Sequence, residues 1–411
     1  MRYKRLTLRH KRAARGQSFF ATARGRFFFT AADGRGFFAT GRGRSFFAAR
    51  RRRSFFAAGR IGAARIAAGI CAAAAALCLP ILIVAAASAP KPLQIYVIDV
   101  EGGQSTLFVT PSGHSLLIDT GWPGNNNRDA DRIAAAAKSA GISRIDFVLL
   151  THYHADHTGG VPQLAAKMPI GAFIDHGPNR EQDADTEQVF EAYQKVLADK
   201  GIKRITAKPG DVLPIIGLHA TAVSADGAVL DRPLSGAGEA NSACKIAEKL
   251  PDDASENQRS LGTMITFGKA RILDLGDLTW DKERQLMCPA NKLGRVDIFV
   301  VSHHGYETSN SSALVDAIGA RIAVMDNGAT EGGEPATWLR VRNAPGLEDL
   351  WQLHLIEAQS SGEQVHNVSD RFIANLAGPD TGHYLKVAVW SDGSFDVVNS
   401  RTGATKHYPA R

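Results

Sequence analysis

The sequence predicts a layered α/β domain over residues 90–411, and two observations carry this prediction. Short apolar stretches with strand character alternate along this region with amphipathic stretches of helical period. Clusters rich in His and Asp stand directly after several of the apolar stretches. Such a pattern is typical of layered α/β proteins whose functional site lies along one edge of the sheets.

Eight segments are expected to form the regular structure of this domain. The predicted single strands are residues 93–100, 145–152 and 297–305. Hairpins are predicted over residues 105–121, 259–277 and 384–400, with turns at Ser112-Gly113 in the first and Asp392-Gly393 in the last. Helices are predicted over residues 131–141 and 187–201, because each amphipathic stretch ends on a glycine.

The beginning of the chain differs sharply in charge from the rest. Residues 1–65 hold 18 Lys and Arg against one acid and carry +17, whereas the remainder carries −10. Residues 1–60 repeat Phe pairs at a nine-residue period, and we expect them to be disordered or to lie upstream of the true translation start. A basic arm for nucleic acid or anionic lipid is the alternative. Because the remainder is acidic, we infer no specific nucleic-acid binding for it.

Residues 61–89 are predicted to be an export signal. The uncharged stretch 66–90 follows Arg60 and Arg65 and ends in small residues, and we expect cleavage after Ala87. The stretch is also long enough to span a bilayer, so an uncleaved anchor that attaches the protein to a membrane is the alternative. The protein is therefore expected to be periplasmic or extracellular.

Two cysteines, Cys244 and Cys288, fall within the predicted domain. Their spacing matches no zinc motif and no nucleophile signature, and we interpret them as unrelated residues. Export would permit a disulfide between them.

The segment THYHADHTGG, residues 151–160, holds the densest group of metal-binding residue types in the chain. Neutral imidazole nitrogens and carboxylate oxygens are the ligands that zinc takes when a position must stay open for water. Three histidines and an aspartate in this order after a strand therefore predict a metal site. Its members are His152, His154, Asp156 and His157.

One loop supplies too few ligands, so further donors are expected at the ends of other strands. Asp277 follows one apolar stretch, with Asp274 inside that stretch as the alternative. The pair His303 and His304 follows another apolar stretch.

Four short motifs give the chain a resemblance to the metallo-β-lactamase fold superfamily. They are LLIDTG (116–121), THYHADHTGG (151–160), LGD (275–277) and SHHG (302–305). The resemblance implies a four-layered αββα sandwich. The chain looks most similar to the hydrolase domain of competence DNA-uptake proteins, through SHHGY and the Asn-x-x-Ser-like segment ENQRSLGTMITFG. The resemblance does not extend to the membrane channel of those proteins, so it does not imply DNA uptake.

Carried over residue by residue, the resemblance implies two metal positions. His152 and His154 would hold the first metal, and Asp277 would bridge both metals. The second metal would be held by Asp156, His157 and His304, of which His304 is the histidine directly before the glycine.

The resemblance also implies roles for residues around these ligands. Asp119 is expected to orient the histidine loop by hydrogen bonds rather than to bind metal. His303 is expected to lie behind the ligands or to face the substrate. Asp156 or Asp277 is expected to accept a proton during turnover.

The chain departs from the superfamily's pattern at two places. The additional histidine that normally precedes the penultimate strand is missing, and this region offers Glu256, Asn257 and Ser260 instead. Glu256 is therefore a candidate oxygen ligand for the first metal, and Glu256 and Asn257 are candidates for contact with the substrate. We expect one or two Zn²⁺ ions, with Mn²⁺ as the alternative because oxygen donors suit it. The second departure is Gln104, which stands where the similar proteins have an acid.

These residues predict an exported metal-dependent hydrolase. A metal would lower the pKa of a bound water to about 7 and so provide hydroxide at neutral pH. A phosphodiester or other phosphate ester is the preferred substrate, by resemblance alone. A lactone, thioester or β-lactam is the alternative small-molecule substrate, although the missing histidine weakens the β-lactam reading. A non-catalytic binding module that retains the fold is a further alternative.

Overall fold

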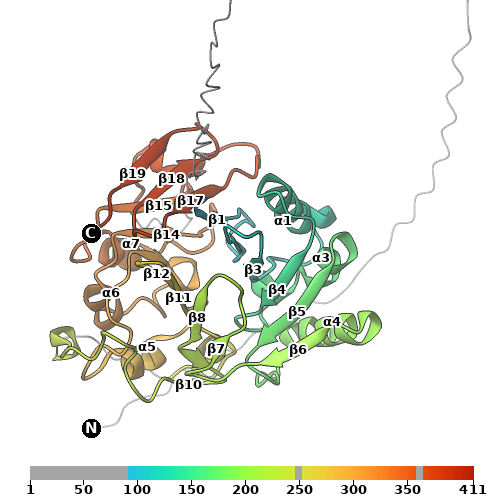
Figure 1. Cartoon of the computed structure of the whole chain (residues 1–411), viewed down its shortest axis with the longest axis horizontal. Coiled ribbons are helices and arrows are strands. Elements are labelled where there is room, and N and C mark those ends of the chain that lie inside the picture. The colour runs from blue at the N-terminus through green and yellow to red at the C-terminus, as the bar shows by residue number, and fades with distance from the viewer. Residues whose placement is uncertain (1–90, 246–251, 358–363) are drawn as a thin grey trace, which may run out of the picture. The chain divides into compact units, whose positions relative to one another are not determined.

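The computed structural model describes residues 91–245, 252–357 and 364–411. The predicted segments 1–60 and 61–89 lie outside the described residues. Within the described part, two large sheets pack face to face and helices cover their outer faces (Figure 1). The predicted four-layered αββα sandwich is confirmed.

The first sheet, sheet A, has nine strands. Its four strands β3, β4, β5 and β6 pair in parallel, and the remaining neighbours pair antiparallel. In spatial order the strands are β19 (Thr405–Tyr408), β18 (Phe395–Asn399), β17 (Leu385–Val389), β1 (Leu93–Val97), β2 (Thr106–Val109), β3 (Ser115–Ile118), β4 (Ile145–Leu149), β5 (Ile170–Asp175) and β6 (Lys203–Thr206).

The second sheet, sheet B, has eight strands, and those from β12 to β16 run parallel. In spatial order they are β16 (Ile373–Asn375), β15 (Asp349–His354), β14 (Ile322–Met325), β13 (Ile298–Val300), β12 (Ala270–Asp274), β11 (Thr263–Phe267), β8 (His219–Ala222) and β7 (Val212–Leu213). A separate short pair consists of β9 (Ser224–Ala225) and β10 (Ala228–Val229).

Helices connect the strands on the outer faces. The α-helices are α1 (Arg128–Ser139), α2 (Ala155–Thr158), α3 (Val161–Lys167), α4 (Ala184–Lys200), α5 (Trp280–Met287), α6 (Ser312–Ile318) and α7 (Pro335–Arg342). Short 3-10 turns are η1 (Asn125–Asn127), η2 (Ser242–Lys245), η3 (Asn257–Arg259), η4 (Ser302–Gly305) and η5 (Asp370–Phe372). The predicted strands, hairpins and helices are all present; strands β1 and β4 begin at the predicted residues, and the other bounds differ from the prediction by a few residues.

Helix ends follow from capping residues in the sequence. The side chain of Asp183 accepts hydrogen bonds from the backbone of Asp185 and Thr186 at the start of α4. Gly201 ends that helix in a left-handed conformation, with φ +62°, which glycine adopts without strain.

Three apolar layers hold the sandwich together. Alternation along the strands sends Ile95 of β1 into the layer between the two sheets and Tyr96 to the outer face of sheet A. That outer face packs against α1, α3 and α4, and Ile133 is a residue of α1 that is fully buried there. The outer face of sheet B packs against α5, α6 and α7. Each helix is stabilised by the apolar face that it buries, so removing one layer exposes an entire sheet face.

The C-terminal strands continue sheet A. Strand β17 pairs antiparallel with β1, with Leu93 opposite Val389, and β18 and β19 follow. Phe395 and Tyr408 are fully buried in the layer between the sheets. The last part of the chain is thus part of the same core.

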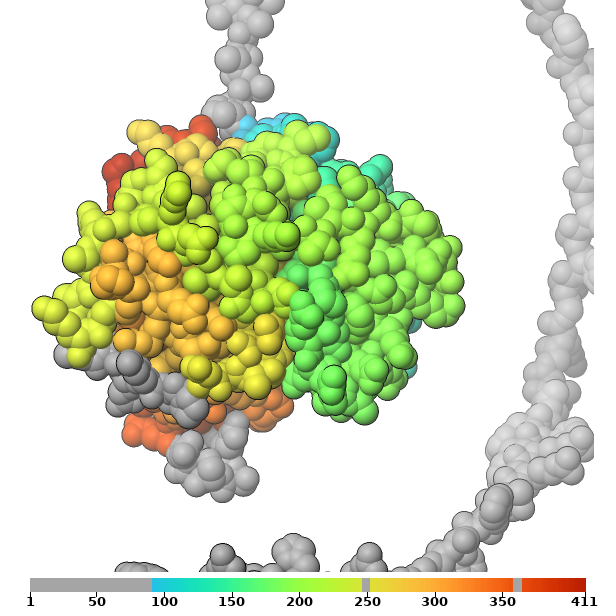
Figure 2. All heavy atoms as spheres, turned by 90° about the horizontal axis from the view of Figure 1, so that it is seen from below, coloured from blue at the N-terminus to red at the C-terminus, as the bar shows by residue number. Residues whose placement is uncertain are grey.

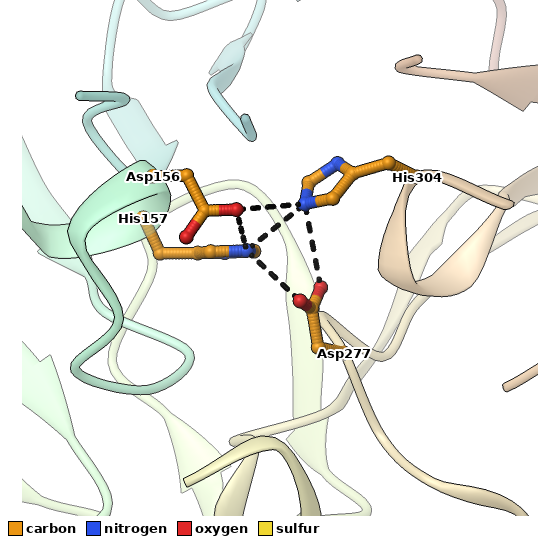
Figure 3. Close-up of side chains that lie close together, drawn as sticks. All are labelled: Asp156, His157, Asp277 and His304. Atoms are coloured by element: carbon orange, nitrogen blue, oxygen red, sulfur yellow. Dashed lines mark hydrogen bonds and ion pairs between the residues drawn. The ribbon is translucent and has the colours of Figure 1, made fainter. Parts of the chain in front are cut away.

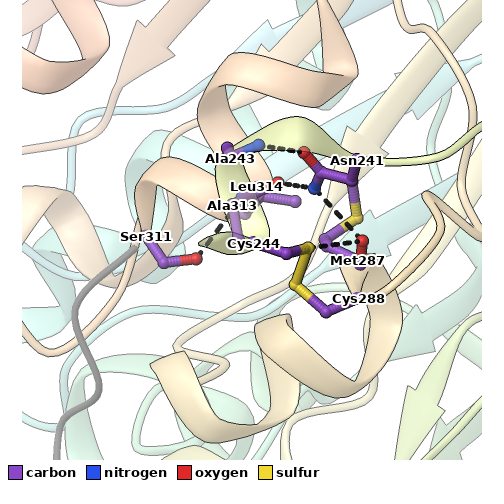
Figure 4. The surroundings of a disulfide bond; sticks show 8 residues. All are labelled: Asn241, Ala243, Cys244, Met287, Cys288, Ser311, Ala313 and Leu314. Atoms are coloured by element: carbon purple, nitrogen blue, oxygen red, sulfur yellow. Dashed lines mark hydrogen bonds between the residues drawn. A yellow bond between two sulfur atoms is a disulfide. The ribbon is translucent and has the colours of Figure 1, made fainter. Parts of the chain in front are cut away.

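A disulfide joins Cys244 to Cys288, which corrects their interpretation as unrelated residues. It attaches η2 to the residue that follows α5, and Asn241 beside it donates to the carbonyls of Met287 and Ala313 (Figure 4). In Figure 2 the yellow-green residues of this segment lie against orange residues of the sheet B half. Spacing along the chain could not reveal the pair, because packing of the segment on α5 and α6 brings the cysteines together.

Among the helices of the described residues, none combines the length and the hydropathy that crossing a bilayer requires.

Glu283 of α5 is a buried carboxylate that supports the loop after β13. It accepts hydrogen bonds from the backbone N–H groups of Asn310 and Ser311 at 2.7 and 2.6 Å. The side chain of Asn310 in turn holds both backbone groups of Ser302, at the start of η4. Burial raises the pKa of Glu283 to about 7, although these hydrogen bonds lower it.

Glu283→Gln should change how stability depends on pH. A folded-state pKa of about 7, against an ordinary value of 4.5, means that the folded wild type loses stability as pH rises between these values. From about pH 4.5 to about pH 8, the free energy of unfolding of the variant should gain roughly 3 kcal/mol relative to the wild type. Denaturant titrations of metal-depleted protein measure this, with the exposed Glu307→Gln as control. Parallel pH profiles for wild type and Glu283→Gln would contradict the assignment.

Candidate metal centre

The polar clusters of the sequence meet at one edge of the sandwich. Asp119 follows β3, His152 follows β4, Asp277 follows β12, and His303 and His304 follow β13. The parallel strands of each sheet present their carboxyl ends at a common edge, which is where open α/β sheets place their ligands. Residues more than a hundred positions apart therefore become neighbours.

Four side chains form the tightest group. Ligand atoms of Asp156, His157, Asp277 and His304 lie within 4.8 Å of one another (Figure 3). His157 Nε2 lies 3.1 Å from His304 Nε2 and 3.2 Å from Asp277 Oδ2, while Asp156 Oδ2 lies 3.3 Å from His304 Nε2. This group holds the predicted ligands of the second metal together with the predicted bridge.

The other half of the site is more open. His152 is fully buried, and its Nε2 lies 3.8 Å from Asp277 Oδ2 without a hydrogen-bond partner among the described residues. His154 lies beside it, with ring centroids 4.6 Å apart, and its side chain is 26% exposed. Asp277 thus stands between the four-residue group and the pair of His152 and His154, as a bridging ligand must.

His303 and Asn257 lie at the rim. His303 Nε2 is 3.4 Å from Asp277 Oδ2 and 3.4 Å from the side-chain nitrogen of Asn257. The hydroxyl of Thr308 lies 2.9 Å from His303 Nδ1. His303 and Asn257 are therefore placed to contact a bound substrate. His303 is not part of the four-residue group.

The loops reach this geometry through unusual backbone conformations. His303 and His304 both have positive φ, +54° and +51°, a region that non-glycine residues occupy at a cost. Gly276 has φ +54°, and a Cβ there would lie 2.7 Å from Cβ of Thr151. The chain thus needs glycine next to Asp277 to bring it against the histidine loop.

Two of the histidines each have a carboxylate next to the ring nitrogen Nδ1. Asp119 Oδ2 lies 2.7 Å from His157 Nδ1 and accepts from the Thr151 hydroxyl, while its Oδ1 accepts from the Thr151 backbone. Asp326, which follows β14, lies 3.3 Å from His304 Nδ1. Such carboxylates fix the ring orientation of metal-binding histidines. Asp326 was missed in the sequence, although it follows an apolar strand just as Asp277 does.

The carboxylate of Glu256, a candidate oxygen ligand of the first metal position, contacts two residues outside the predicted ligand set. It is fully buried, lies 2.9 Å from His176 Nε2 and accepts from the backbone of Arg180. Glu181 instead lies next to His154, with Oε2 3.0 Å from Nε2. The sequence carries no signal for this, because Glu181 lies in an irregular loop whose path depends on its tertiary contacts.

Gln104 donates its side-chain N–H groups to both oxygens of Asp274, at 2.9 and 2.7 Å. Asp274 is fully buried, and burial raises its pKa to about 7, while the hydrogen bond from Gln104 lowers it. Where the similar proteins have an acid, this chain therefore has an amide, and this amide faces the carboxylate of Asp274 on β12. Asp274 lies in this pair, and Asp277 lies in the four-residue group.

The charges of the group are balanced by neighbours of opposite sign. Burial alone would raise the pKa of Asp277, but His157, His303 and His304 hold it well below its ordinary range. Burial would lower the pKa of His157, but Asp277, Asp156 and Asp119 hold it well above. Burial itself, with His157 and His154, lowers the pKa of His152, so this imidazole is neutral. A divalent cation would replace the protons of such a group.

The donor set fits a metal. It offers imidazole nitrogens and carboxylate oxygens at suitable separations, and His152 Nε2 and Asp277 Oδ1 are buried atoms without a hydrogen bond among the described residues. Such atoms are costly to bury unless something binds them. Nitrogen and oxygen donors of this kind suit zinc, manganese and iron, so the donors alone do not choose the metal.

Comparison with known proteins agrees with the fold and the motifs. Residues 99–238 match a family described as the metallo-beta-lactamase superfamily. The chain carries a metallo-hydrolase domain of this superfamily.

Parts of this chain are similar in sequence to parts of curated proteins. Recombination protein 2 of Haemophilus influenzae is 25% identical over 254 residues, which are 61% of this chain and 26% of that protein. Atrochrysone carboxyl ACP thioesterase of Emericella nidulans is 34% identical over 109 residues, 25% of this chain and 33% of that protein. The alignments thus span a quarter to a third of these relatives' lengths.

A solved structure with similarity to the chain is Zn²⁺-bound PqqB from Methylobacterium extorquens. It is 16% identical, and the alignment covers 57% of this chain and 89% of that one with a TM-score of 0.35.

Asp119→Asn should weaken metal binding by the metallo-hydrolase domain. Asparagine retains the contact with the Thr151 backbone but loses the second carboxylate oxygen, which faces His157. Affinity should fall about 10- to 100-fold, measured by chelator competition. Asp146→Asn is the matched control, because Asp146, near the start of β4, also contacts a histidine, His114. Equal losses in both variants would contradict the orienting role.

Gln104 and Asp274 should show strong energetic coupling. Gln104→Glu places two buried carboxylates together and should lower the free energy of unfolding by roughly 3–5 kcal/mol at about pH 8. The double variant Gln104→Glu/Asp274→Asn exchanges carboxylate and amide and should recover most of that loss. Denaturant unfolding of the two single variants, the double variant and the wild type gives the coupling energy. Additive losses would show that the two side chains are independent.

Proposed function

We propose that the protein is an exported metal-dependent hydrolase that cleaves a phosphodiester or another phosphate ester. The observation that carries the proposal is the convergence of Asp156, His157, Asp277 and His304 beside the unpartnered Nε2 of His152. These residues would hold a metal. When bound, a divalent metal supplies an activated water at neutral pH and a Lewis acid for the charge that develops on the substrate.

The chain's own residues would position substrate and protons around this group. Asp156 is 18% exposed and His303 is 16% exposed, so the open side of the site lies along these two side chains. Burial lowers the pKa of His303, and Asp277 only partly offsets this, so the ring is a neutral donor at pH 7. His303 and Asn257 would donate hydrogen bonds to a substrate oxygen, and the Asp156 carboxylate would accept a proton at this rim.

Two observations support the choice of a phosphate ester. Recombination protein 2 is named for a process of nucleic acids, whose backbone is a phosphodiester, and similarity to it extends over 61% of this chain, against 25% for the thioesterase. The imidazole missing from the first metal position is not replaced by another histidine among the described residues near His154, where Glu181 lies instead. Oxygen-rich sites suit metals that act on phosphate oxygens.

A thioester is the second candidate substrate. The thioesterase of Emericella nidulans is 34% identical over the 109 residues that it shares with this chain. The same residues would hold the metal for either ester, since a bound divalent metal would supply an activated water and a Lewis acid in both cases.

Export is supported by two features. Residues 61–89 have the composition of an export signal. The bond between Cys244 and Cys288 belongs to a class that persists in oxidising compartments.

Asp277→Ala and His154→Ala should each abolish hydrolysis, because they remove the bridge and a ligand of the first metal. The wild type, loaded with Zn²⁺ or Mn²⁺, is assayed against bis(p-nitrophenyl) phosphate, an acyl thioester, a lactone and a β-lactam. We expect turnover of the phosphodiester, with a loss of at least about 10³-fold in each variant. His366→Ala, which changes a histidine stacked on Trp338, is the control. Turnover of the thioester alone would select the second candidate, and full activity of Asp277→Ala would refute the metal-dependent mechanism.

A further inference from the structure

The first metal position has two histidines where the superfamily's pattern calls for three. His152 and His154 come from the loop after β4, and Ser260 occupies the region expected to supply the third imidazole, with its hydroxyl 3.5 Å from His152 Nδ1. That hydroxyl also accepts from the backbone of Asp277, which positions Asp277. Ser260 therefore contacts the outer nitrogen of His152 and leaves Nε2 free.

Glu181 lies where a third ligand is needed. Its Oε2 is 3.0 Å from His154 Nε2. Both side chains are partly exposed, Glu181 at 25% and His154 at 26%. The carboxylate comes from the loop that follows β5, and thus from a third strand end of sheet A.

The position of Glu181 is set by contacts that do not involve metal. Asn179 accepts from the Glu181 backbone N–H and donates to the Glu181 carbonyl, both at 2.9 Å. The backbone N–H of Glu256 donates to Glu181 Oε2 at 2.7 Å. A carboxylate held in this way is positioned before the metal arrives, which reduces the entropy lost on binding.

A second observation concerns His152, the other histidine of the predicted first metal position. His152 Nε2 is fully buried and without a hydrogen bond among the described residues, and it lies 3.8 Å from Asp277 Oδ2. That separation is too long for a hydrogen bond and is compatible with two ligands of one ion.

We propose that Glu181 is the third protein ligand of the first metal position, with His152 and His154, and that Asp277 is shared with the second position. The proposal rests on the assignment of the chain as a metallo-hydrolase. The first position then has two nitrogen and two oxygen donors. Since carboxylates suit manganese better than imidazoles do, this position favours Mn²⁺ over Zn²⁺ more than a site with three histidines would.

Metal content tests this proposal without any substrate. The purified full-length protein is stripped with a chelator, reloaded with Mn²⁺ or Zn²⁺ and desalted, and bound metal per chain is measured by mass spectrometry. The wild type should hold two ions. Glu181→Gln should hold one, with at least a tenfold weaker affinity for the ion lost, measured by chelator competition. Glu331→Gln removes a different exposed carboxylate, one that accepts from Tyr306, and should hold two.

Glu181→His restores an imidazole and keeps the proposal testable if Glu181→Gln folds poorly. This variant should hold two ions, and the ratio of its Zn²⁺ affinity to its Mn²⁺ affinity at the first position should be higher than that of the wild type. Two ions in Glu181→Gln with wild-type affinity, or a single ion in the wild type, would overturn the proposal. A protein that holds two ions but cleaves no phosphate ester would contradict only the proposed substrate.

Discussion

The contacts of Asp277 join the two halves of the sandwich at the site. Its Oδ2 lies 3.2 Å from Nε2 of His157, which sheet A supplies, and its Oδ1 lies 3.7 Å from Nε2 of His304, which sheet B supplies. Both predicted metal positions include Asp277, so each takes donors from both sheets. The apolar layer between the sheets therefore does more than stabilise the fold, because its packing sets the distance between the two groups of ligands.

Each histidine of the four-residue group is supported from behind by a chain of buried polar contacts. Asp119 contacts His157, and Asp326 contacts His304. The loop of His304 is held by Asn310, which Glu283 holds in turn. Removing a member of such a chain leaves a buried polar group without a partner, which costs more than the hydrogen bond contributes. The strained backbone of His303 and His304 is maintained by these contacts.

The sequence predicted the parts of the site that follow a local rule. Asp277 and His304 were found because each follows an apolar strand, and the same rule would have found Asp326. Glu181 and Glu256 lie in irregular segments whose paths depend on contacts with distant residues, so no local pattern distinguishes the carboxylate beside His154 from the one beside His176. The fold was predicted through its motifs, and strands β5 and β14, which no such motif contains, were not part of the prediction.

The chemistry of the donors connects the metal to the substrate. A first position with His152, His154, Glu181 and Asp277 would supply as many oxygen as nitrogen donors, and the second would add Asp156. Metals that prefer oxygen donors also prefer oxygen atoms of the substrate. A phosphate ester presents anionic oxygens to such a site, whereas a thioester presents one neutral carbonyl and a soft sulfur. Exchange of an imidazole for a carboxylate therefore favours the phosphate ester, and it does so through residues of this chain rather than through its relatives.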